Sequence, residues 1–111
     1  FEPWGDPGGP FTPTYKTYSI ENVEEEEISH DYEITYDVDW ISVSPMSGTL
    51  GPQESVVVTV ELTEGAEALP IGEHTAVVSF TNTSTGEGNT TREVVLTAGG
   101  PQPVRHVLAI R

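Results

Sequence analysis

Apolar and polar residues alternate along much of this chain. In the longest run, residues 28–40, every second position is apolar, aromatic or histidine: Ile28, His30, Tyr32, Ile34, Tyr36, Val38 and Trp40. The positions between them are all polar. Alternation with a period of two predicts an antiparallel strand with one buried face. Because strands usually run about 5–6 residues, we expect a break near residues 36–39 and therefore two strands.

The same pattern predicts four further strands, over residues 14–22, 54–63, 72–82 and 91–98. Residues 104–110 are predicted to form either a last strand or the entry to a following domain. The inward positions of these strands supply the expected core: Tyr18, Ile20, Ile34, Val56, Val58, Val60, Val78, Phe80, Val94 and Leu96.

Turn-forming residues separate the predicted strands. Prolines and glycines predict a loop over residues 45–52, and a glycine-containing hairpin loop is expected over residues 84–90. Residues 64–69 are predicted to be a loop rather than one helical turn. Short strands with turn signals about every ten residues, and no helical periodicity, indicate an all-β immunoglobulin-like antiparallel β-sandwich of about seven strands.

Composition suggests three segments. Residues 1–13 are rich in proline and glycine and predict a linker or an edge segment, in which Trp4 and Phe11 would dock on the domain. Residues 14–98 form the predicted domain. Residues 99–111 are predicted to be a C-terminal linker plus the last-strand candidate.

Four stretches of the chain resemble the BACON and BACON-like family of exported bacterial and phage proteins. They are GGPFTPTYKTYSIEN (8–22), VDWISVSPMSGTLGPQESVVVTVEL (38–62), ALPIGEHTAVVSFTNTSTG (68–86) and TTREVVLTA (90–98). The resemblance implies an immunoglobulin-like module attached to larger exported proteins, often enzymes or adhesins. It also implies the carbohydrate-binding role that has been suggested for the family. His74 and the acidic run at 24–27 depart from the family pattern.

Charge and composition exclude several functions. The net charge of −14 repels nucleic acid and anionic membrane surfaces. The absence of cysteine excludes disulfides and thiolate chemistry. No apolar run is long enough to insert into a membrane. We expect a fragment of an exported protein, located extracellularly, in the periplasm or at the cell surface, with no cofactor.

Exposed aromatic side chains are the first candidates for a ligand site, because they stack on the apolar faces of sugars. The chain offers Trp4, Phe11, Tyr15, Tyr36 and Trp40. The first choices for a polysaccharide site are Trp4, Tyr15 and Trp40. Packing is the competing interpretation and is favoured for all three: Trp40, which ends an apolar face, would pack in the core, and Trp4 and Tyr15 would pack within a flanking segment.

Metal and catalytic chemistry have little support in the sequence. Asp37 and Asp39 share a face and are the alternative calcium candidates, but no calcium-binding loop motif occurs and a solvated acidic surface is the favoured explanation. The three histidines, His30, His74 and His106, lack a ligand spacing. No nucleophile motif is present, so we predict that the protein is not an enzyme. Asparagine-linked glycosylation acceptor sequences begin at residues 82 and 89.

Three functions follow as hypotheses. The leading one is a non-catalytic accessory module that spaces or presents the neighbouring domains of its parent chain. The second is a carbohydrate-binding module. The third is protein–protein adhesion through a sheet edge, in which residues 104–110 supply or accept a strand.

Overall fold

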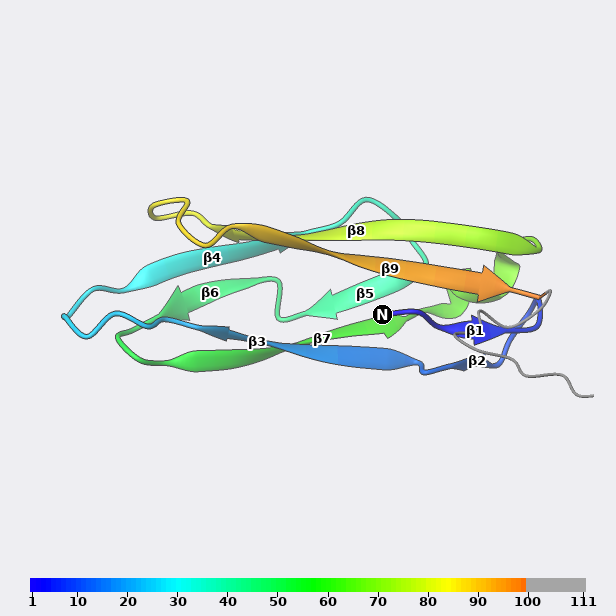
Figure 1. Cartoon of the computed structure of the whole chain (residues 1–111), viewed down its shortest axis with the longest axis horizontal. Coiled ribbons are helices and arrows are strands. Elements are labelled where there is room, and N and C mark those ends of the chain that lie inside the picture. The colour runs from blue at the N-terminus through cyan, green and yellow to red at the C-terminus, as the bar shows by residue number, and fades with distance from the viewer. Residues whose placement is uncertain (100–111) are drawn as a thin grey trace, which may run out of the picture.

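Two β-sheets lie face to face in the computed structural model, which describes residues 1–99 (Figure 1). The elements, in chain order, are β1 (Trp4–Gly5), β2 (Phe11–Thr12), β3 (Tyr15–Glu21), β4 (His30–Thr35), β5 (Ile41–Ser44), β6 (Ser47–Leu50), β7 (Ser55–Leu62), the 3₁₀ helix η1 (Glu64–Ala68), β8 (Gly72–Asn82) and β9 (Thr90–Ala98). One sheet has the order β2-β1-β9-β8-β4-β6, and the other has the order β3-β7-β5.

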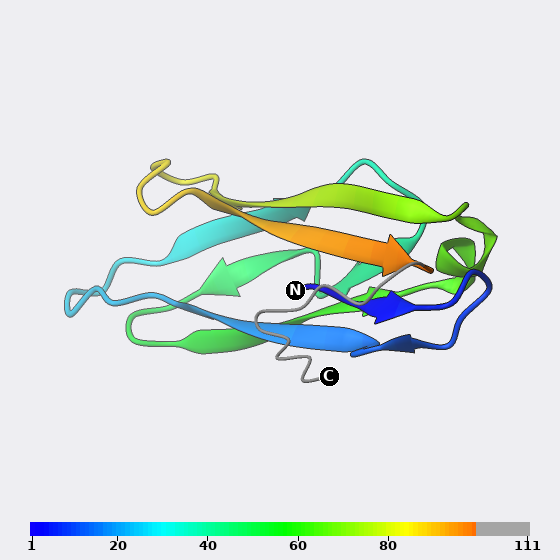
Figure 2. The ribbon, with the colours of Figure 1, turned by 45° about the vertical axis from the view of Figure 1, so that its right-hand side comes forward.

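The predicted fold class is confirmed: the chain is an all-β immunoglobulin-like sandwich, whose two layers are also visible in Figure 2. Two details of the prediction are wrong. Residues 1–99 form nine strands rather than about seven, and β1 pairs with β9 in parallel whereas every other pair is antiparallel. The additional strands are β1, β2 and β6, each of two to four residues.

The core lies between the sheets and is built from the inward positions of the alternating runs. Of the predicted core residues, seven are buried, and six of these have no exposed surface; the seven are Ile34, Val58, Val60, Val78, Phe80, Val94 and Leu96. Tyr18, Ile20 and Val56 are partly buried and pack against this cluster. Burial of each such side chain stabilises the fold by about 1.5–3 kcal/mol, so the alternation largely determines which face of each strand turns inward.

The long alternating run is interrupted where the length of natural strands requires it. β4 ends at Thr35 and β5 begins at Ile41, in the opposite sheet. The placement of Ile28 inside the strand is wrong. It precedes β4, its backbone N–H bonds to the carbonyl of Glu26 in a turn, and its side chain is 40 % exposed.

The prediction of a loop over residues 45–52 is also wrong in part. β6 pairs with β4 from His30↔Leu50 to Glu33↔Ser47, and therefore lies in the six-stranded sheet while β5 lies in the other. The chain changes sheet between β5 and β6, and this closes one side of the sandwich. Gly48 permits the pairing, because a Cβ there would stand 2.8 Å from the Tyr32 hydroxyl oxygen.

Residues 64–69 were expected to be a loop, but η1 forms there. Thr63 caps its N-terminus by accepting a hydrogen bond from the N–H of Gly65, and Ala66 is buried. Capping satisfies a donor that a short helix otherwise leaves free.

Residues 1–13 form an edge segment rather than a free linker. β1 pairs with β2 and with the end of β9, and Phe11 is buried. The strand predicted at 104–110 and His106 lie outside the described residues.

Candidate functional site

A pocket of about 360 Å³ lies between the two sheets at the end of the sandwich that carries the loop 22–29 and the hairpin 83–89. This is the left-hand end in Figure 1. Four apolar residues from four strands line it: Ile20, Tyr32, Leu50 and Phe80. The polar and loop residues of its lining are Glu21, Asn22, Val23, Glu24, His30, Asp31, Thr81, Asn82, Glu87 and Gly88.

Strand register explains how these apolar side chains meet. Tyr32 pairs with Asn82 and Ile34 with Phe80 across β4 and β8, so Tyr32 and Phe80 stand on the inward face two positions apart. Both are 9 % exposed. Phe80 also meets the ring of Tyr18 on the opposite sheet edge-on, with 5.6 Å between ring centroids and an interplanar angle of 61°. The aromatic rings therefore hold the two sheets together beside the pocket.

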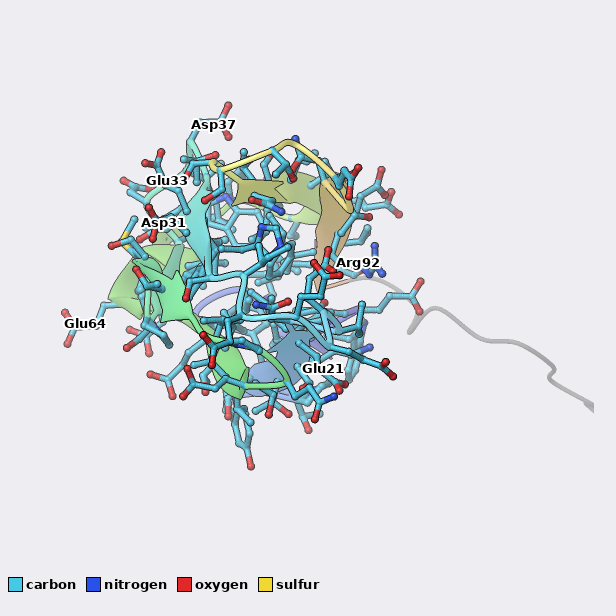
Figure 3. All side chains as sticks on the ribbon, turned by 90° about the vertical axis from the view of Figure 1, so that its left-hand side faces the viewer. Glu21, Asp31, Glu33, Asp37, Glu64 and Arg92 are labelled. Carbon is cyan, nitrogen blue, oxygen red and sulfur yellow. The ribbon has the colours of Figure 1, made fainter. Side chains whose placement is uncertain are left out.

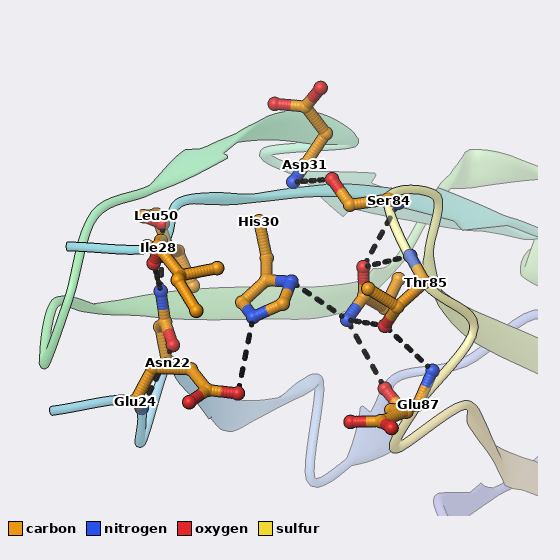
Figure 4. Close-up of polar contacts among 10 residues, drawn as sticks. Asn22, Glu24, Ile28, His30, Asp31, Leu50, Ser84, Thr85 and Glu87 are labelled. Atoms are coloured by element: carbon orange, nitrogen blue, oxygen red, sulfur yellow. Dashed lines mark hydrogen bonds and ion pairs between the residues drawn. The ribbon is translucent and has the colours of Figure 1, made fainter. Parts of the chain in front are cut away.

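Asn22 anchors the loop that borders the pocket. Its side-chain amide donates to the carbonyls of Ile28, at 2.9 Å, and Leu50, at 3.0 Å, and its side-chain oxygen accepts from the N–H of Glu24, at 3.0 Å (Figure 4). Its backbone N–H bonds to the carbonyl of Glu54. Asn22 is the one buried polar residue among residues 1–99, at 4 % exposure. It joins β3, the loop 22–29 and β6, and so connects the two sheets.

His30 lies at the start of β4 between the loop and the hairpin. Its Nε2 is 3.7 Å from a carboxylate oxygen of Glu24, and its Nδ1 is 3.3 Å from the side-chain amide of Asn82 (Figure 4). The Asn82 amide also donates to the Thr85 hydroxyl and the Glu87 carbonyl, and its oxygen accepts the N–H groups of Ser84 and Thr85. Asn82 therefore shapes the hairpin that forms one wall of the pocket.

The surroundings of the pocket are acidic. Its lining includes four acidic residues, Glu21, Glu24, Asp31 and Glu87, and neither Lys16 nor Arg92, the only lysine and the only arginine within residues 1–99. One of the four, Asp31, is turned toward β6, where it accepts a hydrogen bond from the Thr49 hydroxyl. Figure 3 looks onto this end and shows Asp31 on one side of it, with Glu21 and Arg92 on the other.

Lys16 and Arg92 lie instead along the open side of the sandwich, around Tyr18. The Lys16 ammonium is 5.5 Å from the centre of the Tyr18 ring. Burial raises the pKa of the Tyr18 phenol, and the positive charge of Arg92 offsets part of that rise. Because side chains alternate along a strand, Lys16 shares the inward face of β3 with Tyr18, and Arg92 shares the inward face of β9 with Val94.

A second, shallower groove of about 520 Å³ lies on the same open side. It is lined by Phe1, Glu2, Pro13, Tyr15, Lys16, Glu93 and Val95. Tyr15 is 56 % exposed, which leaves its ring face available to a ligand.

The aromatic residues predicted as ligand candidates do not form one exposed platform. Trp40 and Phe11 are buried, at 5 % and 6 % exposure. Trp4 is half-buried in β1, and its indole N–H is buried with no acceptor among residues 1–99. Tyr36 is half-buried, which leaves Tyr15 as the exposed member of the set.

The other candidates are also scattered. Asp37 and Asp39 are exposed in the β4–β5 connection, and residues 1–99 contain no group of three potential metal ligands. His74 bonds through Nε2 to the Pro70 carbonyl, away from His30. Asn89 lies in the β8–β9 hairpin and accepts a hydrogen bond from the backbone N–H of Asn82.

Sequence reasoning missed the pocket and its anchor. One signal was available for Asn22: it occupies an inward position at the end of the predicted strand 14–22, where a buried amide requires partners. Those partners, the carbonyls of Ile28 and Leu50, come from segments whose proximity no local pattern reveals.

The described elements define a class of protein, an immunoglobulin-like β-sandwich with a pocket at one end. None of its helices within residues 1–99 has the length and apolar character to cross a bilayer. A family model described as the viral BACON domain matches residues 16–93, from β3 into β9. The chain belongs to this family, and the predicted resemblance is confirmed. A comparison with curated protein sequences found no match.

Solved structures share the fold at low sequence identity. The periplasmic chaperone SfaE is similar with a TM-score of 0.63 and 7 % identity, over 89 % of this chain and 54 % of the chaperone. A Bacteroides ovatus protein described as a candidate carbohydrate-binding protein gives 0.58 and 12 %, over 88 % of this chain and 34 % of that one. PapD-like domain 7 of human CEP192 gives 0.58 and 13 %, over 92 % and 82 %. The chain spans about half the length of the first chaperone.

Proposed function

We propose that this chain is a non-catalytic accessory module of a viral protein, which spaces or presents the neighbouring parts of that protein outside the cell. The observation that carries the proposal is the family match over residues 16–93, because the matched region is the sandwich itself. A module of this kind acts through its rigidity and its surface.

Physical features of the chain support this role. The buried side chains form one core cluster between the sheets. Six of the core side chains predicted from the alternation have no exposed surface. An exterior carrying a net charge of −14 favours solubility and disfavours association between copies. The candidate catalytic groups do not converge, since His30 and His74 lie in separate environments.

The proposal predicts cooperative unfolding and no saturable binding of a polysaccharide. The 111-residue chain would be unfolded in urea while the fluorescence of its tryptophans and its circular dichroism are recorded. We expect one coincident transition by both probes. A glycan array, screened with and without calcium, would be blank. Saturable binding of a polysaccharide would overturn the purely mechanical role, and a chain unfolded in isolation would overturn independent folding.

Carbohydrate binding is the second candidate, supported by the groove beside Tyr15. An exposed aromatic ring next to a basic side chain, Lys16, is suited to stacking on a sugar and bonding its hydroxyl or carboxylate groups. A Tyr15→Ala variant would then lose array binding, while Tyr36→Ala, altered in the β4–β5 connection, would keep it. Equal loss in both variants would count against the groove.

A further inference from the structure

The pocket at the end of the sandwich has no part in a spacing role. We propose that it binds an organic cation, an ammonium group carried on an apolar stem. This inference goes beyond the accessory function and leaves that function standing whether or not it holds. Three features carry it: the size of the pocket, its aromatic lining and the sign of the charges around it.

The size and lining suit a small apolar body. A volume of about 360 Å³ lies within the range of small-molecule sites. Its apolar residues are Ile20, Leu50 and the rings of Tyr32 and Phe80, which come from both sheets. A ligand stem placed against them would displace water from apolar surface, which is favourable.

The aromatic rings add a preference for positive charge. Tyr32 and Phe80 line the pocket, and because each is 9 % exposed, a small part of each side chain is accessible to a ligand there. A cation within about 6 Å of an aromatic centroid is attracted by the ring quadrupole, and the attraction grows when water is excluded.

The charged residues around the pocket have the same preference. Glu21, Glu24 and Glu87 belong to its lining, and Glu24 stands beside His30 with its side chain 39 % exposed. Neither basic residue of the described chain contributes to the lining. Lys16 contacts the Tyr18 ring, and Arg92 donates to the Thr90 hydroxyl and the Thr91 carbonyl. A cationic ligand would therefore meet acidic residues, with no lysine or arginine of residues 1–99 in the lining and His30 beside Glu24 as its one titratable base.

The test compares three probes of nearly the same shape: benzylamine, benzyl alcohol and benzoate. Each would be titrated into the isotopically labelled 111-residue chain at low salt, and amide chemical shifts would be followed by NMR. We expect shifts at Asn22, Tyr32 and Phe80, and about five- to thirty-fold tighter binding of the amine than of the alcohol. Benzoate would not bind. Equal affinity for amine and alcohol, or shifts elsewhere on the domain, would overturn the proposal.

Two matched variants separate the pocket from the general acidity of the protein. Glu24→Gln removes one charge from the pocket, and Glu73→Gln removes one exposed charge from the start of β8 at the opposite end. We expect Glu24→Gln to weaken benzylamine several-fold and Glu73→Gln to leave it within twofold. Equal weakening by both would assign the effect to the overall field and overturn the site. Unchanged amide shifts away from the substitutions would show that both variants fold.

A fourth probe distinguishes the source of the cation. Nα-acetyl-lysine methylamide carries the same ammonium group as benzylamine on the stem of a protein side chain. Tighter binding of benzylamine would assign the pocket to free aromatic amines, and tighter binding of the lysine derivative would assign it to a lysine of a partner protein. Failure of both cations to shift the pocket resonances would overturn the proposal.

Discussion

Removing the side chain of Asn22 should destabilise the whole sandwich. In Asn22→Ala the carbonyls of Ile28 and Leu50 lose their donors, and the N–H of Glu24 loses its acceptor. Each hydrogen bond contributes about 0.5–1.5 kcal/mol net, and a buried group left unsatisfied costs about 1–3 kcal/mol. Because the Leu50 carbonyl bond is buried and the others are partly buried, we expect a loss of about 2–4 kcal/mol. This is a large share of the roughly 5–15 kcal/mol typical of a domain.

The assay is urea unfolding followed by the fluorescence of the two tryptophans, of which Trp40 is buried and reports loss of the core. For a domain of this size the loss corresponds to a fall in Tm of roughly 10–25 °C. Ser29→Ala, in the same loop and exposed, is the control and should change the free energy of unfolding by less than about 0.5 kcal/mol. A loss below about 1 kcal/mol in Asn22→Ala would refute the role of this amide as a connection between the sheets.

An isosteric change sharpens the test. Asn22→Asp keeps the acceptor for Glu24 but turns a carboxylate oxygen toward the two carbonyls. Burial and the facing carbonyls would raise the pKa of this carboxyl in the folded state. The folded chain would then bind the proton more tightly than the unfolded chain, so the stability of the variant should rise as the pH falls toward 4. Equal stability of the variant and the wild type at pH 7 would show that the two hydrogen bonds donated by the Asn22 amide are not needed for stability.

Three further predictions concern other positions. Gly48→Ala should cost about 1–3 kcal/mol, because the new Cβ would stand 2.8–3.0 Å from the hydroxyl and ring atoms of the buried Tyr32; urea unfolding measures it, and addition of Tyr32→Phe should recover part of the loss. Gln53→Gly should stabilise the chain by up to about 1 kcal/mol, since Gln53 has φ 60°; a lower Tm would contradict this. The Tyr18 phenol has a raised pKa in the folded state, so its contribution to stability is complete below about pH 10 and is lost as the pH rises through the folded value. Tyr18→Phe should therefore make the unfolding free energy less dependent on pH between about 9 and 11, and an unchanged slope would argue against burial as the cause.

Local alternation was sufficient to predict the long strands, because each has one face that must be buried. β8 occupies residues 72–82 as predicted. β3 and β7 are one residue shorter than predicted at each end, and β9 begins one residue earlier. The break between β4 and β5 followed from strand length alone.

The short strands could not be predicted in this way. β6 contains Ser47, Gly48 and Thr49, a composition typical of turns, and it becomes a strand because the edge of β4 offers unpaired backbone groups. β1 and β2 form for the same reason beside β9. Such elements depend on the tertiary partner rather than on their own side-chain pattern.

The pocket could not be predicted from the sequence for a related reason. It needs residues near positions 20, 30 and 80 to converge, and the alternation gives the face of each residue but not its neighbours in space. Tyr32 belonged to an apolar face, and nothing in its local sequence distinguished a pocket lining from a packed core. For Trp40 the apolar face that it ends favoured core packing over a ligand site, and the structure places it in the core.

The position of Lys16 affects whether two copies of the chain can pair through their sheet edges. β3 is an edge strand of the described sheets, and its unpaired backbone groups could form hydrogen bonds with an edge strand of another copy. A second strand docking there would come close to the exposed Lys16 side chain, whose ammonium lies over the Tyr18 ring. Arg92 is likewise a charged residue on the part of β9 that β1 leaves uncovered. A charged side chain at a sheet edge disfavours pairing between copies, so Lys16→Val should make the chain more prone to associate.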